Sequence, residues 1–250
     1  GFKPASYGPP LPVTRPAGWT PPAGAPSYWG GDILQLQIGT GVAVRMSGPP
    51  DTTAGNVTIA DNSVANFTAN DYAMLGDCTS ATIFQVNSVA AGPPVLLSYK
   101  TSGGTVPALN AAGLPGFSVL TFPTVQHVDQ VTYYVGQTPA GLSALYRYSM
   151  ARNTTEEVAE NVEDMDVMYG VGVNGAMAAG SFKHADTMTT ANWSNVIGVR
   201  VSLVSVGDQL GAAPANQALQ FHGTTWNAPN TRLRQVFTGT TAMRDRLVTQ

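Results

Sequence analysis

The stretch at residues 156–173, EEVAENVEDMDVMYGVGV, changes character halfway along its length. Its first half is acidic and holds all four glutamates of the chain, which are Glu156, Glu157, Glu160 and Glu163. Its second half has an apolar residue at every second position, at Met165, Val167, Tyr169 and Val171. A period of two is typical of a half-buried strand. The stretch therefore predicts a polar turn, with at most one helical turn at 156–161, that leads into a strand.

The same alternation recurs elsewhere in the chain. Segments 32–38 and 196–206 place apolar residues at alternate positions, and segment 125–135 does so at Val131, Tyr133 and Val135. The 250-residue chain also contains 27 glycines and 18 prolines, which favour short strands joined by turns over helices. We therefore predict a mainly β fold built from antiparallel β-sheets with long loops.

Two of these segments give more specific expectations. Segment 32–38 should form a hairpin with 42–46 through the turn Gly39-Thr40-Gly41. Segment 196–206, VIGVRVSLVSV, is the longest predicted strand, and its alternation should bury Val199, Val201 and Leu203 while Arg200 faces water. Segments 174–192 and 207–228 lack such alternation and are predicted to be loops.

The first 31 residues differ from the rest of the chain because they contain eight prolines. Each proline removes a hydrogen-bond donor and fixes φ, so this segment cannot be a helix or a central strand. We predict a strap or linker over residues 1–31 and a β-rich head domain over 32–250. Trp19, Tyr28 and Trp29 suggest that part of the strap packs onto the head, and a proline-rich ligand for a partner groove is the alternative.

The charge content excludes some classes of partner. Charged residues make up only 11% of the chain and the net charge is −3, so no basic field points to nucleic acid. This composition suits an extracellular or periplasmic protein. No apolar run reaches the 18 residues of a membrane span, and the chain begins at Gly1 as if it were cut from a longer protein.

Catalytic and metal-binding motifs are weak. His127, His184 and His222 are scattered without metal-ligand spacing, and nucleophile-elbow, P-loop and dinucleotide motifs do not occur. We therefore predict no enzymatic activity, no cofactor and no small-molecule substrate. The weak metal candidates are the acidic residues Glu160, Glu163, Asp164 and Asp166. A solvated acidic turn is the alternative for them.

Several segments resemble PilW-type minor pilins of type IV pili. The acidic stretch resembles the family's LVEGVEDMQVLYGV, and residues 72–86 resemble DLLLVSDCSRAALFQV. The resemblance continues in four other segments. Residues 32–46 resemble the family's DVLTVRYADGSGVAL, and residues 131–147 resemble its VTYYVG and ALYR. Residues 193–203 resemble WxxVVAVRVSLL, and residues 233–247 resemble LRRVFTTTVALRNRL. Many relatives continue the acidic stretch with a calcium-like loop, but residues 172–176 contain no carboxylate, so no calcium is expected there.

The resemblance implies a non-catalytic α+β pilin whose hydrophobic N-terminal helix would precede Gly1. Before assembly the protein would be anchored in the inner membrane of a Gram-negative bacterium, after prepilin-peptidase processing and methylation, with a periplasmic head. It would then join a tip complex that primes the fimbrium for twitching motility, cell adhesion and, in some pili, DNA uptake. Its partners would be other minor pilins, the major pilin and, through the helix, the inner-membrane assembly machinery, with no nucleic acid bound by the head.

The remaining candidates are one cysteine and four aromatic residues. Cys78 could be a buried free thiol, or it could form a disulfide with a residue outside this chain, as the resemblance implies; no neighbouring cation supports a reactive thiolate. Interfaces are often anchored by aromatic side chains. The candidate partner contacts are Trp19, Tyr28, Trp29 and Trp226. The alternative function is a β-sandwich adhesin or carbohydrate-binding module whose tryptophans stack on sugars.

Overall fold

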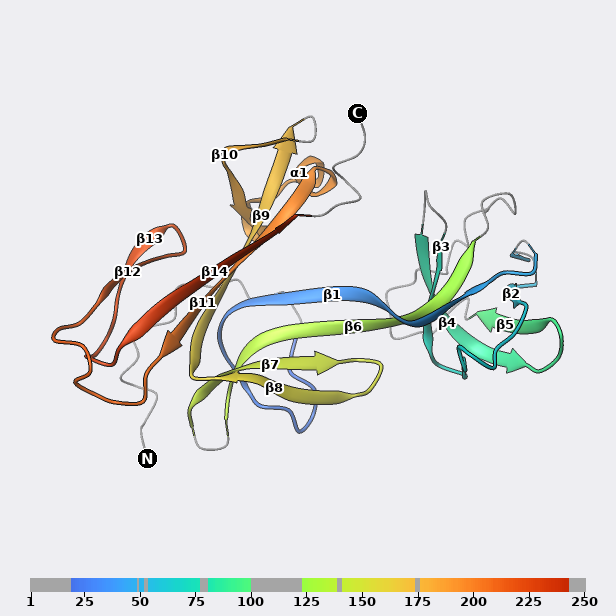
Figure 1. Ribbon diagram of the computed structural model, residues 1–250, viewed down its shortest axis with the longest axis horizontal. Coiled ribbons are helices and arrows are strands. Elements are labelled where there is room, and N and C mark those ends of the chain that lie inside the picture. The colour runs from blue at the N-terminus through green and yellow to red at the C-terminus, as the bar shows by residue number, and fades with distance from the viewer. Residues whose placement is uncertain are drawn as a thin grey trace. The chain divides into compact units, whose positions relative to one another are not determined.

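The computed structural model describes residues 19–48, 50–51, 54–76, 81–99, 123–138, 141–173 and 176–242. The first eight strands are β1 (Tyr28–Arg45), β2 (Asn56–Ile59), β3 (Tyr72–Gly76), β4 (Ala81–Ala90), β5 (Val95–Tyr99), β6 (Thr124–Gln137), β7 (Ser143–Ser149) and β8 (Thr154–Glu160). They are followed by β9 (Val162–Val173), β10 (Ala176–His184), a 3-10 turn (Ala185–Thr187), α1 (Thr190–Ser194), β11 (Val196–Val206), β12 (Ala218–Phe221), β13 (Thr224–Asn227) and β14 (Arg234–Ala242) (Figure 1).

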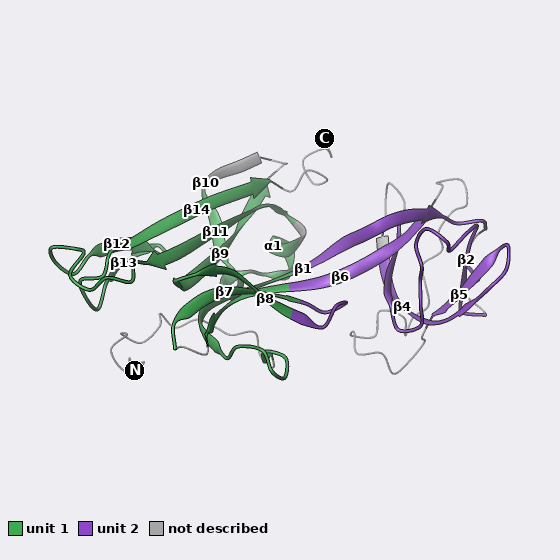
Figure 2. Ribbon diagram, turned by 60° about the horizontal axis from the view of Figure 1, so that its bottom comes forward, with its two compact units in different colours: residues 1–35, 132–148, 155–250 green, residues 36–131, 149–154 purple. Residues whose placement is uncertain are grey.

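Among the described residues, 63% lie in strands and 4% in helices, and the sheets are antiparallel, which confirms the predicted fold class. None of the helices among the described residues is long and apolar enough to cross a membrane. The chain divides into two compact units (Figure 2). Unit 1 comprises residues 1–35, 132–148 and 155–250, and unit 2 comprises 36–131 and 149–154. The strap over residues 1–31 stays a prediction, because its first 18 residues lie outside the described ranges.

Unit 2 is built around strands in the order β2-β5-β4-β3-β6. Alternate positions of these strands face a common core, as period two requires. The largest fully buried side chains of this core are Val57, Ile59, Leu75, Phe84, Val86, Leu97 and Val125.

Unit 1 contains a four-stranded sheet in the order β10-β9-β11-β14, together with the pairing of β6, β7 and β8. Its central cluster consists of Val135, Leu145, Val162, Met165 and Val167. A second, aromatic cluster is formed by Tyr134, Ala144 and Tyr146, with Trp19 and Tyr28 packed against it. Burial raises the pKa of both Tyr134 and Tyr146 to about 12, so these phenols stay neutral.

The two strands predicted most specifically are present. β9 contains the alternating half of the acidic stretch, and β11 has the predicted bounds of 196–206. Val199, Val201 and Leu203 pack against the central cluster as predicted, but they are only half-buried. The opposite face of β11 is the more buried one, because Ser202, Val204 and Val206 are 7%, 1% and 5% exposed. Arg200 does not simply face water, because its guanidinium lies 3.7 Å from the ring centroid of Phe182. A cation–π contact of this kind covers the charge with an aromatic face.

Three local predictions are wrong. The hairpin through 39–41 is absent, since β1 runs unbroken from Tyr28 to Arg45 and pairs with the long strand β6. The helical turn at 156–161 is absent, since Thr154–Glu160 form β8 at the end of a sheet. The loops at 174–192 and 207–228 contain β10, α1 and the hairpin β12–β13. Long-range pairing with β6 overrides the local turn signal in β1, whereas β8, β10 and the hairpin β12–β13 pair with neighbouring segments of the chain.

Val201→Asp should destabilise unit 1 by about 2 kcal/mol, because it buries an unpaired carboxylate against the central cluster. Val201 pairs with Val167 on one side and with Gly239 on the other, so the new side chain would have little freedom to turn away. Denaturant unfolding followed by tryptophan fluorescence measures the loss. Val158→Asp on β8 is the control, since Val158 is 50% exposed and its replacement should change stability little. Equal stability of the two variants would contradict the assigned face of β11.

Candidate functional site

Asp166 lies on the face of β9 opposite the central cluster. Met165 and Val167 point into that cluster, so the alternation of a strand directs Asp166 the other way. The side chain is nevertheless covered, because the residue as a whole is only 3% exposed. A carboxylate in such a position requires a positively charged partner or hydrogen-bond donors.

The register of β10 against β9 brings His184 to this carboxylate. His184, the last residue of β10, pairs with Met168, which lies two positions from Asp166 and therefore on the same face. Its Nδ1 atom is 3.3 Å from Oδ1 of Asp166.

The hairpin formed by β12 and β13 supplies a second histidine. The hairpin turns through His222 and Gly223, whose φ angles are +52° and +68°. Positive φ at both positions is the mark of a type I′ turn, the tight turn that matches the twist of paired strands. Nδ1 of His222 lies 3.0 Å from the same Oδ1 atom of Asp166.

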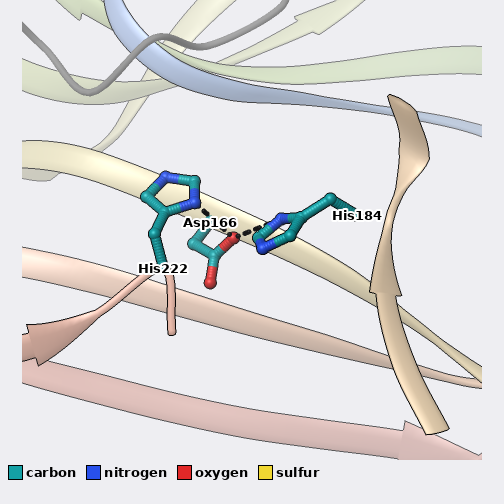
Figure 3. Close-up of side chains that lie close together, drawn as sticks. All are labelled: Asp166, His184 and His222. Carbon is teal, nitrogen blue, oxygen red and sulfur yellow. Dashed lines mark ion pairs between the residues drawn. The ribbon is translucent and has the colours of Figure 1, made fainter. Parts of the chain in front are cut away.

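Figure 3 shows the two imidazoles reaching Asp166 from different elements, His184 from β10 and His222 from the turn between β12 and β13. The rings are stacked with centroids 5.2 Å apart. Neither ring donates an aligned hydrogen bond to Asp166, because Oδ1 is buried and has no hydrogen-bond partner. Nε2 of His222 is also buried without a partner. The three side chains are thus close to one another without being joined by regular hydrogen bonds.

Two more carboxyl groups lie in this region. Asp32 accepts a hydrogen bond from the Val167 amide at 2.7 Å, and Asp164 accepts one from the Met165 amide at 2.8 Å. Burial raises the pKa of Asp164 to about 7 and also raises the pKa of Asp32. Burial would lower the pKa of His222, but the direct contact with the Asp166 carboxyl group, followed by the charges of Asp166, Asp164 and Asp32, outweighs it and raises that pKa. Burial thus favours the neutral form of Asp164 and Asp32, while the neighbouring carboxyl groups favour the protonated form of His222.

Asp166, His184 and His222 can offer one ligand atom each to a metal ion, and these atoms lie within 4.8 Å of one another. Within the described ranges, this is the one such group of histidine, cysteine and carboxylate side chains. Two imidazoles and one carboxylate are ligands typical of zinc and other divalent transition metals.

The structure separates the four acidic residues that the sequence grouped together. Asp166 lies in the cluster and Asp164 beside it, whereas Glu160 is exposed on β8. Glu163 is buried in an ion pair with Arg234 instead. The histidines were dismissed at the sequence level because their spacing matches no motif. The pair His222-Gly223 between two short β-prone segments was the signal that could have predicted the hairpin.

The four aromatic candidates all belong to unit 1. Trp19 and Tyr28 pack against the aromatic cluster, and Trp29 packs against the central cluster. The Trp226 ring lies 5.6 Å from the guanidinium of Arg234. Their role as partner contacts stays a prediction. Cys78 lies outside the described residues.

Comparison with known proteins gives one result for the chain. Residues 132–245, which include Asp166, His184 and His222, match the family model described as Type IV Pilus-assembly protein W. No curated protein and no solved structure matches the chain.

Proposed function

The match over residues 132–245 supports a PilW-type pilus protein, and from that premise we propose that the chain is the head of a minor pilin. In this proposal the head is periplasmic before assembly, while the protein is held in the inner membrane, and lies at the pilus tip afterwards. It joins other minor pilins in a complex that primes assembly of the pilus and serves twitching motility and adhesion. Its contribution is binding and not catalysis.

The family match carries this proposal, because involvement in type IV pilus assembly implies contact with other pilus components. An exposed strand within the matched region supports it. β14 is the end strand in the order β10-β9-β11-β14, as its position in Figure 1 illustrates. End strands offer backbone groups to which another chain can add by β-pairing.

The side chains at this strand suit such a contact. Phe237 on β14 and Leu233 just before it are each 53% exposed, although both are large and apolar. Phe237 pairs across the sheet with Leu203, which packs against the central cluster. The Phe237 ring therefore lies beside a core residue while remaining accessible to solvent. Exposed aromatic side chains on a rigid strand are effective interface anchors. We therefore propose β14 with Leu233 as the surface that binds a neighbouring minor pilin head.

Phe237→Asp should weaken binding of this head to its neighbouring minor pilin heads by about thirtyfold, since an anchor residue contributes about 2 kcal/mol or more. Binding would be measured by calorimetry with the purified heads encoded in the same pilus gene cluster. Val158→Asp is the matched control, because Val158 is 50% exposed on β8, away from the proposed surface. Equal affinity of the two variants for the neighbouring heads would reject β14 as the interface. If the unaltered head bound none of the other minor pilin heads, the proposed tip complex would be rejected.

A further inference from the structure

We propose that Asp166, His184 and His222 form a binding site for a divalent transition-metal ion of the zinc class. The ion would fasten the end of β10 and the hairpin β12–β13 to β9. The site lies within unit 1 and its argument does not depend on the proposed function.

The distances from Oδ1 of Asp166 to the two imidazoles fit shared coordination. Zinc binds nitrogen and oxygen ligands at about 2.1 Å, which separates neighbouring ligand atoms by about 3.0 Å at a right angle and about 3.4 Å at the tetrahedral angle. The two histidine Nδ1 atoms lie 3.0 and 3.3 Å from Oδ1 of Asp166. Both contacts are imidazole–carboxylate ion pairs, and the buried Oδ1 atom has no hydrogen-bond partner of regular geometry. A cation between the three atoms would satisfy the oxygen.

The backbone at His222 is a second, independent observation. The described residues other than glycine that have positive φ are Asn66, Asn70, Asn153, Asn161 and His222. Asparagine is the residue that the first position of a type I′ turn favours, and the chain uses asparagine at the other four positive-φ positions. At the hairpin turn the chain therefore has a histidine in place of the favoured asparagine. Histidine, like asparagine and aspartate, is enriched among residues with positive φ, so the turn accepts it, and it holds Nδ1 of His222 at 3.0 Å from Oδ1 of Asp166.

The choice of ion follows from the ligands and the surrounding groups. Imidazole nitrogen suits zinc, nickel, copper and iron, whereas calcium and magnesium are held by oxygen ligands alone. Two further carboxyl groups lie beside the three ligands, because Asp164 accepts a hydrogen bond from the Met165 amide and Asp32 accepts one from the Val167 amide, on the residues that flank Asp166. Three protein ligands leave one tetrahedral position for water or for a group from a partner.

The test uses the untagged chain, freed of metal with a chelator and then titrated with Zn²⁺ by calorimetry. The unaltered chain should bind one ion with a dissociation constant below about 10 μM, and its unfolding temperature should rise with zinc concentration. Titration with Co²⁺ in its place should give the visible absorption of a tetrahedral site with nitrogen and oxygen ligands, which zinc should then displace.

His222→Asn is the decisive variant, because asparagine keeps the type I′ turn and removes only the imidazole. It should fold normally by far-UV circular dichroism and lose affinity for zinc by about a hundredfold, as should His184→Gln. His127→Asn is the matched control. His127 belongs to unit 2, where it stacks on Phe67 and contacts the Ala65 carbonyl, so binding should be unchanged. Failure of the unaltered chain to bind, or equal binding by the folded His222→Asn chain, would overturn the proposal.

Discussion

Replacing Arg234 by methionine is expected to lower the free energy of unfolding of unit 1 by about 3–5 kcal/mol. The guanidinium donates to Glu163 through Nε at 2.6 Å and through Nη2 at 3.0 Å, and both residues are buried. Nη1 donates to Oδ1 of Asn230 at 2.8 Å and to the carbonyl of Arg232 at 3.2 Å. The substitution would leave the Glu163 carboxylate buried without its cation, and that unpaired charge is the main cost.

Tryptophan fluorescence during denaturant unfolding is the measurement suited to this prediction. All four tryptophans of the chain, Trp19, Trp29, Trp193 and Trp226, belong to unit 1. Arg147→Met is the control, since Arg147 pairs with the largely exposed Glu156 at 3.3 Å and such pairs contribute about 1 kcal/mol or less.

A second variant separates the unpaired charge from lost packing. Glu163→Met combined with Arg234→Met replaces both ions with apolar side chains and should recover much of the stability. If Arg234→Met alone cost no more than Arg147→Met, the buried pair would not support unit 1.

The predictable part of the fold is the part that local alternation determines. β9 and β11 each bury one face against a shared cluster, so Met165, Val167 and Val201 reveal their strands by period alone. The segment Gly39-Thr40-Gly41 has the residues of a turn, but β6 offers a partner along its length and β1 continues through it. Which strand lies opposite is long-range information that a local pattern does not carry.

The candidate site was only partly predictable for the same reason. Asp166 stands out because it is the last residue of a dense acidic run, at the point where the apolar alternation begins. His184 and His222 reach it through a strand register and a hairpin turn, so their spacing in the sequence has no regularity. In the sequence Glu163 is a candidate metal ligand beside Asp166. In the structure it instead forms an ion pair with Arg234, which lies 71 positions away in the chain.

A strain that lacks this protein is expected to assemble few or no type IV pili and to lose twitching motility. The expectation follows from the proposed priming role, because the first subunits of an ordered assembly make few contacts and need a preformed complex to start from. Returning the full-length gene should restore both pili and movement. Returning it with Phe237→Asp should restore them poorly, whereas Val158→Asp should restore them fully.

Surface pili counted by electron microscopy in the deletion strain test the assembly role most directly. The account predicts that pili are absent or rare and that the full-length gene restores their number. Pili of normal number and length in cells without the protein would contradict it.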